Sequence, residues 1–163
     1  MASVIQTLRD EHAQLLPHLE HVLALADAIE PGSNAALIER VGAVHGFLTS
    51  HLLDHAYVEE QALYPTVGRT LGAPEATATM SRDHVEIGRL IDELSELRRE
   101  IEGGAITPAQ AQSLRRVLYG LYAIVKLHFA KEEEVYLKLL EERLSPSQAR
   151  DLQEALELAG NAA

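Results

Sequence analysis

The chain has 163 residues, of which 47% are hydrophobic, and this predicts one folded domain with a sizeable core. Its formal charge of −11, from 25 acidic and 14 basic residues, disfavours nucleic acid and anionic membranes as partners. The absence of Cys excludes disulfides, thiolate metal sites and cysteine nucleophiles, so any metal must be bound by nitrogen and oxygen atoms. Neither a long apolar run nor a signal peptide is found, so we expect a soluble, cytoplasmic protein.

Apolar residues recur at spacings of three and four along nearly the whole chain, which predicts an all-α fold. A first helix is expected over about residues 4–29. Pro17 lies inside it and should bend it, because proline removes one backbone hydrogen bond. A second helix is expected over about residues 35–69, with a kink at Pro65 in its last turns.

Two further long helices follow the break at residues 71–74. The third helix ends at Gly103-Gly104, a typical helix terminator. Thr107-Pro108 combines an N-cap residue with proline at the first helical position, which predicts the start of a fourth helix that continues to about Arg143.

The last segment of the chain repeats the same start signal. Ser145-Pro146 precedes a short fifth helix over about residues 148–158. Four long helices with short connections predict an antiparallel up-down-up-down four-helix bundle, with the fifth helix packed outside it or across one end. We therefore expect residues 1–144 to form the bundle, and residues 145–163 to add a helix and tail to the same domain.

Each long helix carries one His on its apolar stripe, namely His12, His55, His84 and His128. A residue four positions further along a helix stays on the same face, so Glu59 and Glu132 also point inward. With a rise of about 1.5 Å per residue, all six side chains lie within roughly one helical turn of the same level. A single buried His is usually an ordinary hydrogen-bonded core residue, but convergence of six such groups indicates a shared site.

The two inward carboxylates require positive charge. Their burial without cations would cost several kcal/mol each, and neither Lys nor Arg lies near them on the inner stripes. Six nitrogen and oxygen ligands exceed the needs of one tetrahedral zinc ion, which favours a pair of ions. Imidazole with carboxylate favours iron, with manganese or zinc as substitutes. The Glu-x-x-His spacing of ferritin-like di-iron bundles occurs before no His of this chain.

The sequence resembles the hemerythrin-like family, also called the HHE cation-binding domain, over residues 8–144. The strings that carry the resemblance are Asp10-Glu11-His12, His55-Ala-Tyr-Val-Glu59-Glu60-Gln-Ala-Leu-Tyr-Pro65, Arg82-Asp83-His84-Val-Glu-Ile, and His128-Phe-Ala-Lys-Glu132-Glu133-Glu134-Val-Tyr136. The resemblance implies a non-haem, oxo- or hydroxo-bridged di-iron centre that binds or reacts with O2, hydrogen peroxide or nitric oxide. It also implies that Glu59 and Glu132 are bridging carboxylates. The terminal ligands that it implies are His12, His55, His84 and His128.

The chain departs from the family at one position. Oxygen-carrying members have a second His in the third helix, four residues after the first, whereas this chain has Gly88. The gap leaves a coordination position for water, a substrate or another side chain. His51, one turn before His55, is a candidate for that position, and a core His bonded to a backbone carbonyl is an equal alternative for it.

Other residues near the motifs have weaker claims to the site. Glu133 is a rival to Glu132, although a spacing of five rotates it about 140° from His128. Tyr136 follows Glu132 by four and is the Tyr expected beside the metals, with plain packing as its alternative. The remaining histidines fall off the inner stripes and are predicted to be surface or packing residues, namely His18, His21 and His45.

The incomplete His set favours peroxide scavenging, of a catalase-like or peroxidase-like kind, or sensing over reversible oxygen transport, and hence a role in oxidative stress or gas metabolism. An iron sensor or store without turnover is the alternative, and a structural bundle whose His and Glu are relics is a third. The absence of Cys separates the chain from the iron–sulfur cluster repair members of the family, which carry an additional cysteine-bearing region. The expected partner is a small diatomic molecule or peroxide, and the chain is expected to be a monomer or homodimer.

Overall fold

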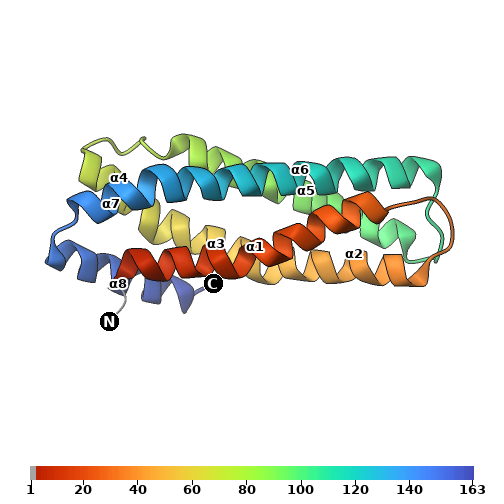
Figure 1. The fold of residues 1–163 in the computed structure, drawn as a ribbon, viewed down its shortest axis with the longest axis horizontal. Coiled ribbons are helices and arrows are strands. Elements are labelled where there is room, and N and C mark those ends of the chain that lie inside the picture. The colour runs from red at the N-terminus through yellow and green to blue at the C-terminus, as the bar shows by residue number, and fades with distance from the viewer. Residues whose placement is uncertain (1–2) are drawn as a thin grey trace.

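The computed structural model describes residues 3–163, and within this range the predicted all-α fold is confirmed. The helical segments join into five continuous helices, which form an elongated bundle (Figure 1). Three of them are uninterrupted α-helices, namely α1 (Val4–Ala28), α5 (Ala78–Ile101) and α8 (Pro146–Gly160).

The other two long helices contain π-helical segments, in which the backbone bonds run from residue i to i+5. One of them joins α2 (Ala35–Phe47), η1 (Leu48–Leu52), α3 (Leu53–Val58), η2 (Glu59–Leu63) and α4 (Tyr64–Leu71). The other joins α6 (Pro108–Lys131), η3 (Glu132–Leu137) and α7 (Lys138–Arg143). Glu59 and Glu132 each open a π-helical segment, and such segments are frequent at functional sites.

The predicted start signals act as helix caps. The Thr107 side chain accepts from the backbone N–H of Gln110, and the Gln110 side chain accepts in return from the N–H of Thr107. Ser145 and Gln148 form the same reciprocal pair, so α8 begins at Pro146, two residues earlier than expected. Both pairs satisfy backbone donors that a helix start leaves unpaired.

The two internal prolines are accommodated differently. α1 continues through Pro17, and its axis changes direction midway in Figure 1. Pro65 lies in the first turn of α4, directly after η2. The missing N–H of Pro65 therefore falls where the hydrogen-bond ladder changes from π to α.

Each of the four long helices packs against two of the others. α1 contacts α2 and α6, and α5 contacts the same two helices. At one end Gly32 and Ile106 exchange two backbone hydrogen bonds of 2.8 Å, which ties the two connections there together. At the other end α8 packs against α1, α3 and η2. No helix in the described part of the chain has the length and apolarity needed to cross a membrane.

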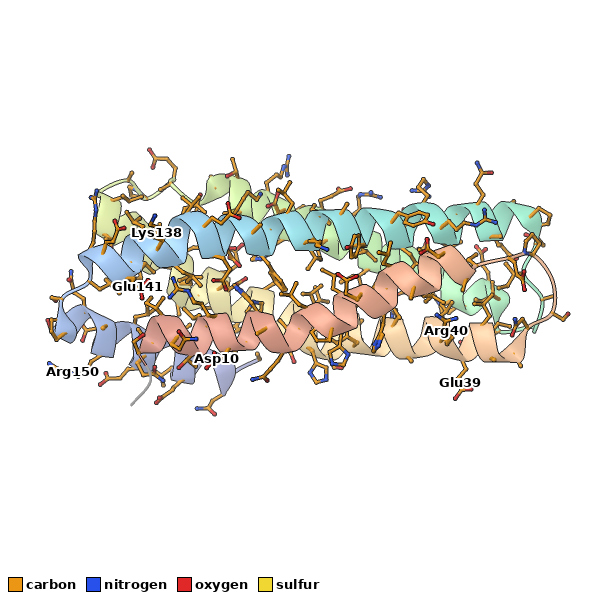
Figure 2. All side chains as sticks on the ribbon, viewed as in Figure 1. Asp10, Glu39, Arg40, Lys138, Glu141 and Arg150 are labelled. Atoms are coloured by element: carbon orange, nitrogen blue, oxygen red, sulfur yellow. The ribbon has the colours of Figure 1, made fainter. Side chains whose placement is uncertain are left out.

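Two clusters of buried apolar side chains fill the bundle, one towards each end. On α1 the first cluster takes residues 4–8 and the second takes 19–29. The same division occurs on each of the other long helices, and in each case the inward His lies between the two clusters or at the edge of one. Most charged side chains lie outside, and those labelled in Figure 2 are all exposed, namely Asp10, Glu39, Arg40, Lys138, Glu141 and Arg150.

Candidate metal centre

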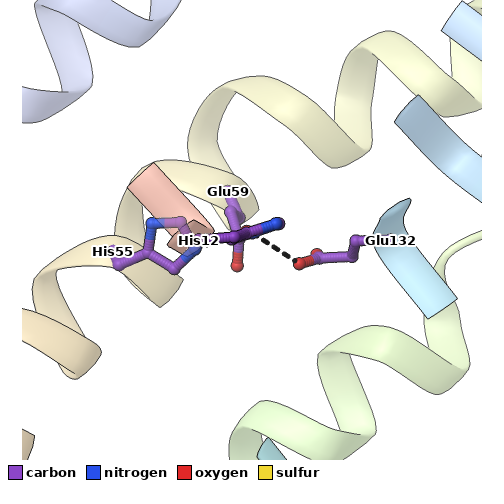
Figure 3. Close-up of side chains that lie close together, drawn as sticks. All are labelled: His12, His55, Glu59 and Glu132. Atoms are coloured by element: carbon purple, nitrogen blue, oxygen red, sulfur yellow. Dashed lines mark ion pairs between the residues drawn. The ribbon is translucent and has the colours of Figure 1, made fainter. Parts of the chain in front are cut away.

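Side chains from all four long helices meet between the two apolar clusters. The first group consists of His12, His55, Glu59 and Glu132, which converge in Figure 3. Nε2 of His55 lies 2.9 Å from Oε1 of Glu59. Nε2 of His12 lies 3.3 Å from Oε2 of Glu132 and 3.6 Å from Oε1 of Glu59.

The second group contains the other two histidines. Nε2 of His84 lies 3.2 Å from Oε2 of Glu59. Nε2 of His128 lies 3.4 Å from Oε1 of Glu132 and 3.8 Å from Oε2 of Glu59. The two imidazoles are themselves close, with 3.0 Å between their Nε2 atoms.

The carboxylates of Glu59 and Glu132 lie between the two histidine pairs. Oε1 of Glu59 faces His12 and His55, whereas Oε2 faces His84 and His128. The oxygens of Glu132 are divided in the same way between His12 and His128. Within each group the donor atoms all lie within 4.8 Å of one another; Glu59 belongs to both groups, whereas Glu132 belongs to the first.

The centre is buried and short of hydrogen bonds. Glu59 is 1% exposed and Glu132 is 0% exposed, and between residues 3 and 163 no Lys or Arg nitrogen lies within 4.0 Å of either carboxylate. In the same part of the chain, five of the six buried side-chain atoms without a hydrogen-bond partner belong to the centre, namely His12 Nε2, His55 Nε2, both oxygens of Glu59, and Oε2 of Glu132. Unpaired buried polar atoms are costly, and cations bound between them would remove that cost.

Carboxylates outside the centre hold two of the imidazoles from behind. Oε1 of Glu60 lies 2.8 Å from Nδ1 of His84, and Oε1 of Glu133 lies 2.7 Å from Nδ1 of His12. Each of these Glu residues directly follows one of the shared carboxylates in the sequence. A proton held on Nδ1 leaves the lone pair of Nε2 directed at the centre, as metal-binding imidazoles require.

The other two imidazoles face acidic residues from α1 and α5. Oδ2 of Asp83 lies 3.1 Å from Nδ1 of His128, and Asp83 is also paired with Lys131. Oε2 of Glu11 lies 3.6 Å from Nδ1 of His55. Each of the four imidazoles thus has a carboxylate beside its Nδ1 atom. The pairs in one half of the centre correspond to those in the other half, which gives the centre approximate twofold symmetry.

The charges of the centre shift the pKa values of its groups. Burial alone would lower the pKa of His12, but the nearby carboxylates of Glu132 and Glu59 outweigh burial and raise it to about 9. The same opposition raises the pKa of His55 and of His128 to about 10. Burial would raise the pKa of Glu59, but its imidazole neighbours hold it well below the usual range. In the metal-free chain, imidazolium protons therefore balance the buried carboxylates, and metal ions would displace them.

Comparison with known proteins identifies the family. The model of the hemerythrin HHE cation binding domain matches residues 3–140. The chain belongs to this family. It is also similar to the iron-sulfur cluster repair protein YtfE of Pectobacterium carotovorum and to that of Pectobacterium atrosepticum, each 26% identical over 127 residues. Each match covers 73% of this chain and 52% of the relative, so the chain spans about half the length of these curated relatives.

Tyr64 also lies in this HHE centre, at a position that α-helical spacing does not predict. Its hydroxyl donates to Oε1 of Glu132 at 2.7 Å, and lies 3.2 Å from Nε2 of His128 and 3.4 Å from Nε2 of His84. The π-helical segment η2 explains this position. Tyr64 follows Glu59 by five residues, and in a helix with i to i+5 bonds this spacing brings both residues to one face. Ordinary α-helical spacing would rotate Tyr64 away from the centre.

Tyr136 lies away from the centre, in agreement with the alternative of plain packing. Its hydroxyl donates to the backbone oxygen of Ala76 at 3.1 Å. Because η3 begins at Glu132, the residue that shares its face is Leu137, which is 0% exposed. The π-helical geometry therefore explains why Tyr64 lies beside the centre and Tyr136 does not.

The remaining candidates lie outside both groups of donor atoms. His51 is exposed, with its ring 5.9 Å from that of Phe47. His18 is exposed and stacks on Phe47, and His21 is exposed beside it. Nε2 of His45 lies 2.5 Å from Oγ of Ser95. The structure thus brings all four stripe histidines together with Glu59 and Glu132, and it leaves the other histidines apart.

Gly88 lies in open space, since a Cβ atom added there would have no neighbouring atom within 4 Å. A cavity of about 10 Å³ borders the centre, lined by His55, Glu59, His84 and His128 together with Leu52, Ala56, Ile87, Val125 and Phe129. This volume corresponds to about one water-sized molecule.

Proposed function

We propose that this chain is a non-haem di-iron protein of the hemerythrin-like kind that reacts with hydrogen peroxide, and that also binds O2 or nitric oxide. The observation that carries the proposal is the division of the oxygens of Glu59 and Glu132 between two histidine pairs. The proposal includes the antiparallel up-down-up-down order of the four long helices, with α8 as part of the same domain. It also includes a role in oxidative stress.

Each iron ion is assigned its own pair of imidazoles. His12 and His55 hold one ion, His84 and His128 hold the other, and Glu59 and Glu132 bridge them. Tyr64 keeps its proton beside these ligands, because its hydroxyl donates to Glu132 and lies within 3.4 Å of Nε2 of both His84 and His128. Manganese or zinc would occupy the same ligands as substitutes.

The bound iron pair would supply two electrons to a small oxidising ligand and stabilise the negative charge that develops on it. The surrounding residues prepare the site for this chemistry. Leu52, Ile87, Val125 and Phe129 make the adjoining cavity apolar and small, which excludes bulky molecules and most water. Glu60 and Glu133 hold the rings of His84 and His12 in the orientation that directs Nε2 inward.

Peroxide reduction is favoured over oxygen transport by the donor set. The second imidazole that oxygen carriers of this family have in the third helix is replaced by Gly88, and a phenol hydroxyl bonded to Glu132 lies beside His84 and His128. Tyr64 thus holds a proton 3.2 Å from Nε2 of His128, inside a centre whose other described donors are imidazoles and carboxylates. A proton at that place assists cleavage of an oxygen–oxygen bond, which must end with protonated oxygen.

The test combines metal analysis with turnover. Protein expressed in iron-rich medium should contain about two iron ions per chain, show a near-ultraviolet charge-transfer band that dithionite bleaches, and consume hydrogen peroxide. Two irons without peroxide consumption would indicate the alternative, an iron sensor or store. Protein that takes up no metal, and whose stability is unchanged in His55→Ala, would contradict both.

A further inference from the structure

A second, larger cavity lies beside the centre, between α4 and the start of α5. Its volume is about 620 Å³, within the range of roughly 300–1,000 Å³ that is typical of small-molecule sites. Part of its wall is closely packed backbone: a Cβ atom at Gly68 would lie 3.2 Å from Cα of Pro74, and both residues line the cavity.

Two residues connect this cavity to the metal centre. Tyr64 lines the cavity, while its hydroxyl is bonded to Glu132 and its ring stacks on His84 at 5.5 Å. Glu60 also lines the cavity and accepts from Nδ1 of His84. A molecule in this cavity would therefore contact residues that touch the centre without entering it.

Groups that attract an anion line the same cavity. Arg69 donates to Oγ1 of Thr66 at 2.9 Å, and within residues 3–163 it has no carboxylate within 4.0 Å. Thr77 precedes α5, a helix of 24 residues whose N-terminus carries partial positive charge.

Thr77 is the second, independent indication of a ligand. It is 4% exposed, its side chain does not cap the helix, and its hydroxyl bonds to no other residue of the described chain. The hydroxyl of this residue is not among the fully buried atoms, and it can bond to a group inside the cavity that Thr77 lines.

The carboxylates of the cavity limit what can bind. Glu60 is held by His84 and by Oγ of Ser81 at 2.8 Å, and can accept a further hydrogen bond. Glu75, the second carboxylate of the cavity lining, is exposed and lies in the connection before α5. A purely anionic molecule would be repelled at Glu60, whereas one that also carries hydroxyl groups would donate to it.

We propose that this cavity binds the electron donor of the peroxide reaction, a small hydroxylated organic anion held by Arg69 and Thr77, with Tyr64 between it and the iron centre. This inference rests on the proposed function. The donor loses two electrons and two protons, and one hydrogen peroxide takes them up to give two molecules of water. Glu60 accepts a hydrogen bond from a donor hydroxyl, and Arg69 is a positioning residue that acts on the anionic group.

The first test measures binding and needs no iron. Ascorbate, a hydroxylated organic anion, is titrated into the metal-free full chain under argon by calorimetry. Arg69→Gln and Thr77→Val should each weaken its binding about tenfold, the scale of one charge-assisted or buried hydrogen bond. Ala78→Phe, which fills the cavity from an exposed lining residue, should abolish binding. The matched control is Arg40→Gln, because Arg40 is also exposed and lies in another pocket, on α2.

The second test uses iron-loaded protein. Arg69→Gln should raise KM for ascorbate about tenfold, with kcat, iron content and KM for uncharged hydroquinone unchanged. Absence of ascorbate binding to the wild type, or equal Kd values in Arg69→Gln and wild type, would overturn the inference. Normal iron content and peroxide consumption in that case would leave the proposed function intact, whereas absence of iron would remove the proposed function itself.

Discussion

The hydroxyl of Tyr64 lies 2.7 Å from Oε1 of Glu132, in the buried centre of the bundle. Replacing Tyr64 by Phe removes this hydroxyl and leaves the ring that stacks on His84. We predict that Tyr64→Phe folds normally but binds iron about 10 to 100-fold more weakly, the usual cost of losing a group that supports a metal ligand. Iron titration monitored by the charge-transfer band measures the change.

Tyr136→Phe is the matched control for this prediction. It makes the same chemical change at a hydroxyl bonded to the backbone oxygen of Ala76, away from the centre. Its iron affinity should equal that of the wild type. Equal loss in both variants, or no loss in Tyr64→Phe, would show that Tyr64 has no special role at the centre.

A second prediction follows from the approximate symmetry of the centre. Glu60 and Glu133 hold Nδ1 of His84 and His12 at nearly equal distances, 2.8 and 2.7 Å. Glu60→Gln and Glu133→Gln should therefore lower iron affinity by similar factors, each about tenfold or more. Glu20→Gln, at an exposed carboxylate bonded to Lys126, is the control. A strong effect of one substitution with none from the other would contradict the symmetric arrangement.

The third prediction concerns pH and the metal-free chain. The pKa values of His12, His55 and His128 are raised from 6.5 to about 9 or 10 in the folded chain. Their protonation therefore stabilises the fold fully below about pH 6.5, and this contribution is lost as pH rises through about 9 to 10. Chemical denaturation of the metal-free chain should show the free energy of unfolding falling by a few kcal/mol between these limits.

The matched pair for this measurement is His55→Gln and His51→Gln. The first removes a histidine of the centre and should flatten the pH dependence, whereas His51 is exposed and outside the centre, so its replacement should leave the slope unchanged. Iron-loaded protein should behave oppositely, because metal binding releases protons and gains affinity as pH rises. A metal-free chain whose stability is constant or increases from pH 6.5 to 10 would contradict the charge balance described for the centre.

Regular α-helical spacing was enough to predict the helices and the meeting of the six inward groups. His12, His55, His84 and His128 lie on apolar stripes, and a uniform rise per residue sets their common level. The detail around Glu59 and Glu132 could not be predicted in this way, since each begins a π-helical segment. Within those segments the angular spacing per residue is smaller, so counting by α-helical turns selected Tyr136 where the structure has Tyr64.

The contacts of residues outside the apolar stripes could not be predicted from helical spacing either. The carboxylates of Glu60 and Glu133 face histidines of other helices, namely His84 and His12, and such pairings depend on how helices pack. The same limit applied to His51: it occupies the predicted stripe one turn from His55, but its side chain is exposed at a pocket formed with α1 and α8.

We propose that Glu59 binds two metal ions at once, because its two oxygens face different histidine pairs. An anaerobic titration of metal-free protein with ferrous ion, followed by calorimetry and metal analysis, tests this proposal. Wild-type protein should bind two ions per chain, and Glu59→Ala should bind neither. Wild-type protein that binds no iron, or a Glu59→Ala variant that still binds two ions with unchanged affinity, would contradict it.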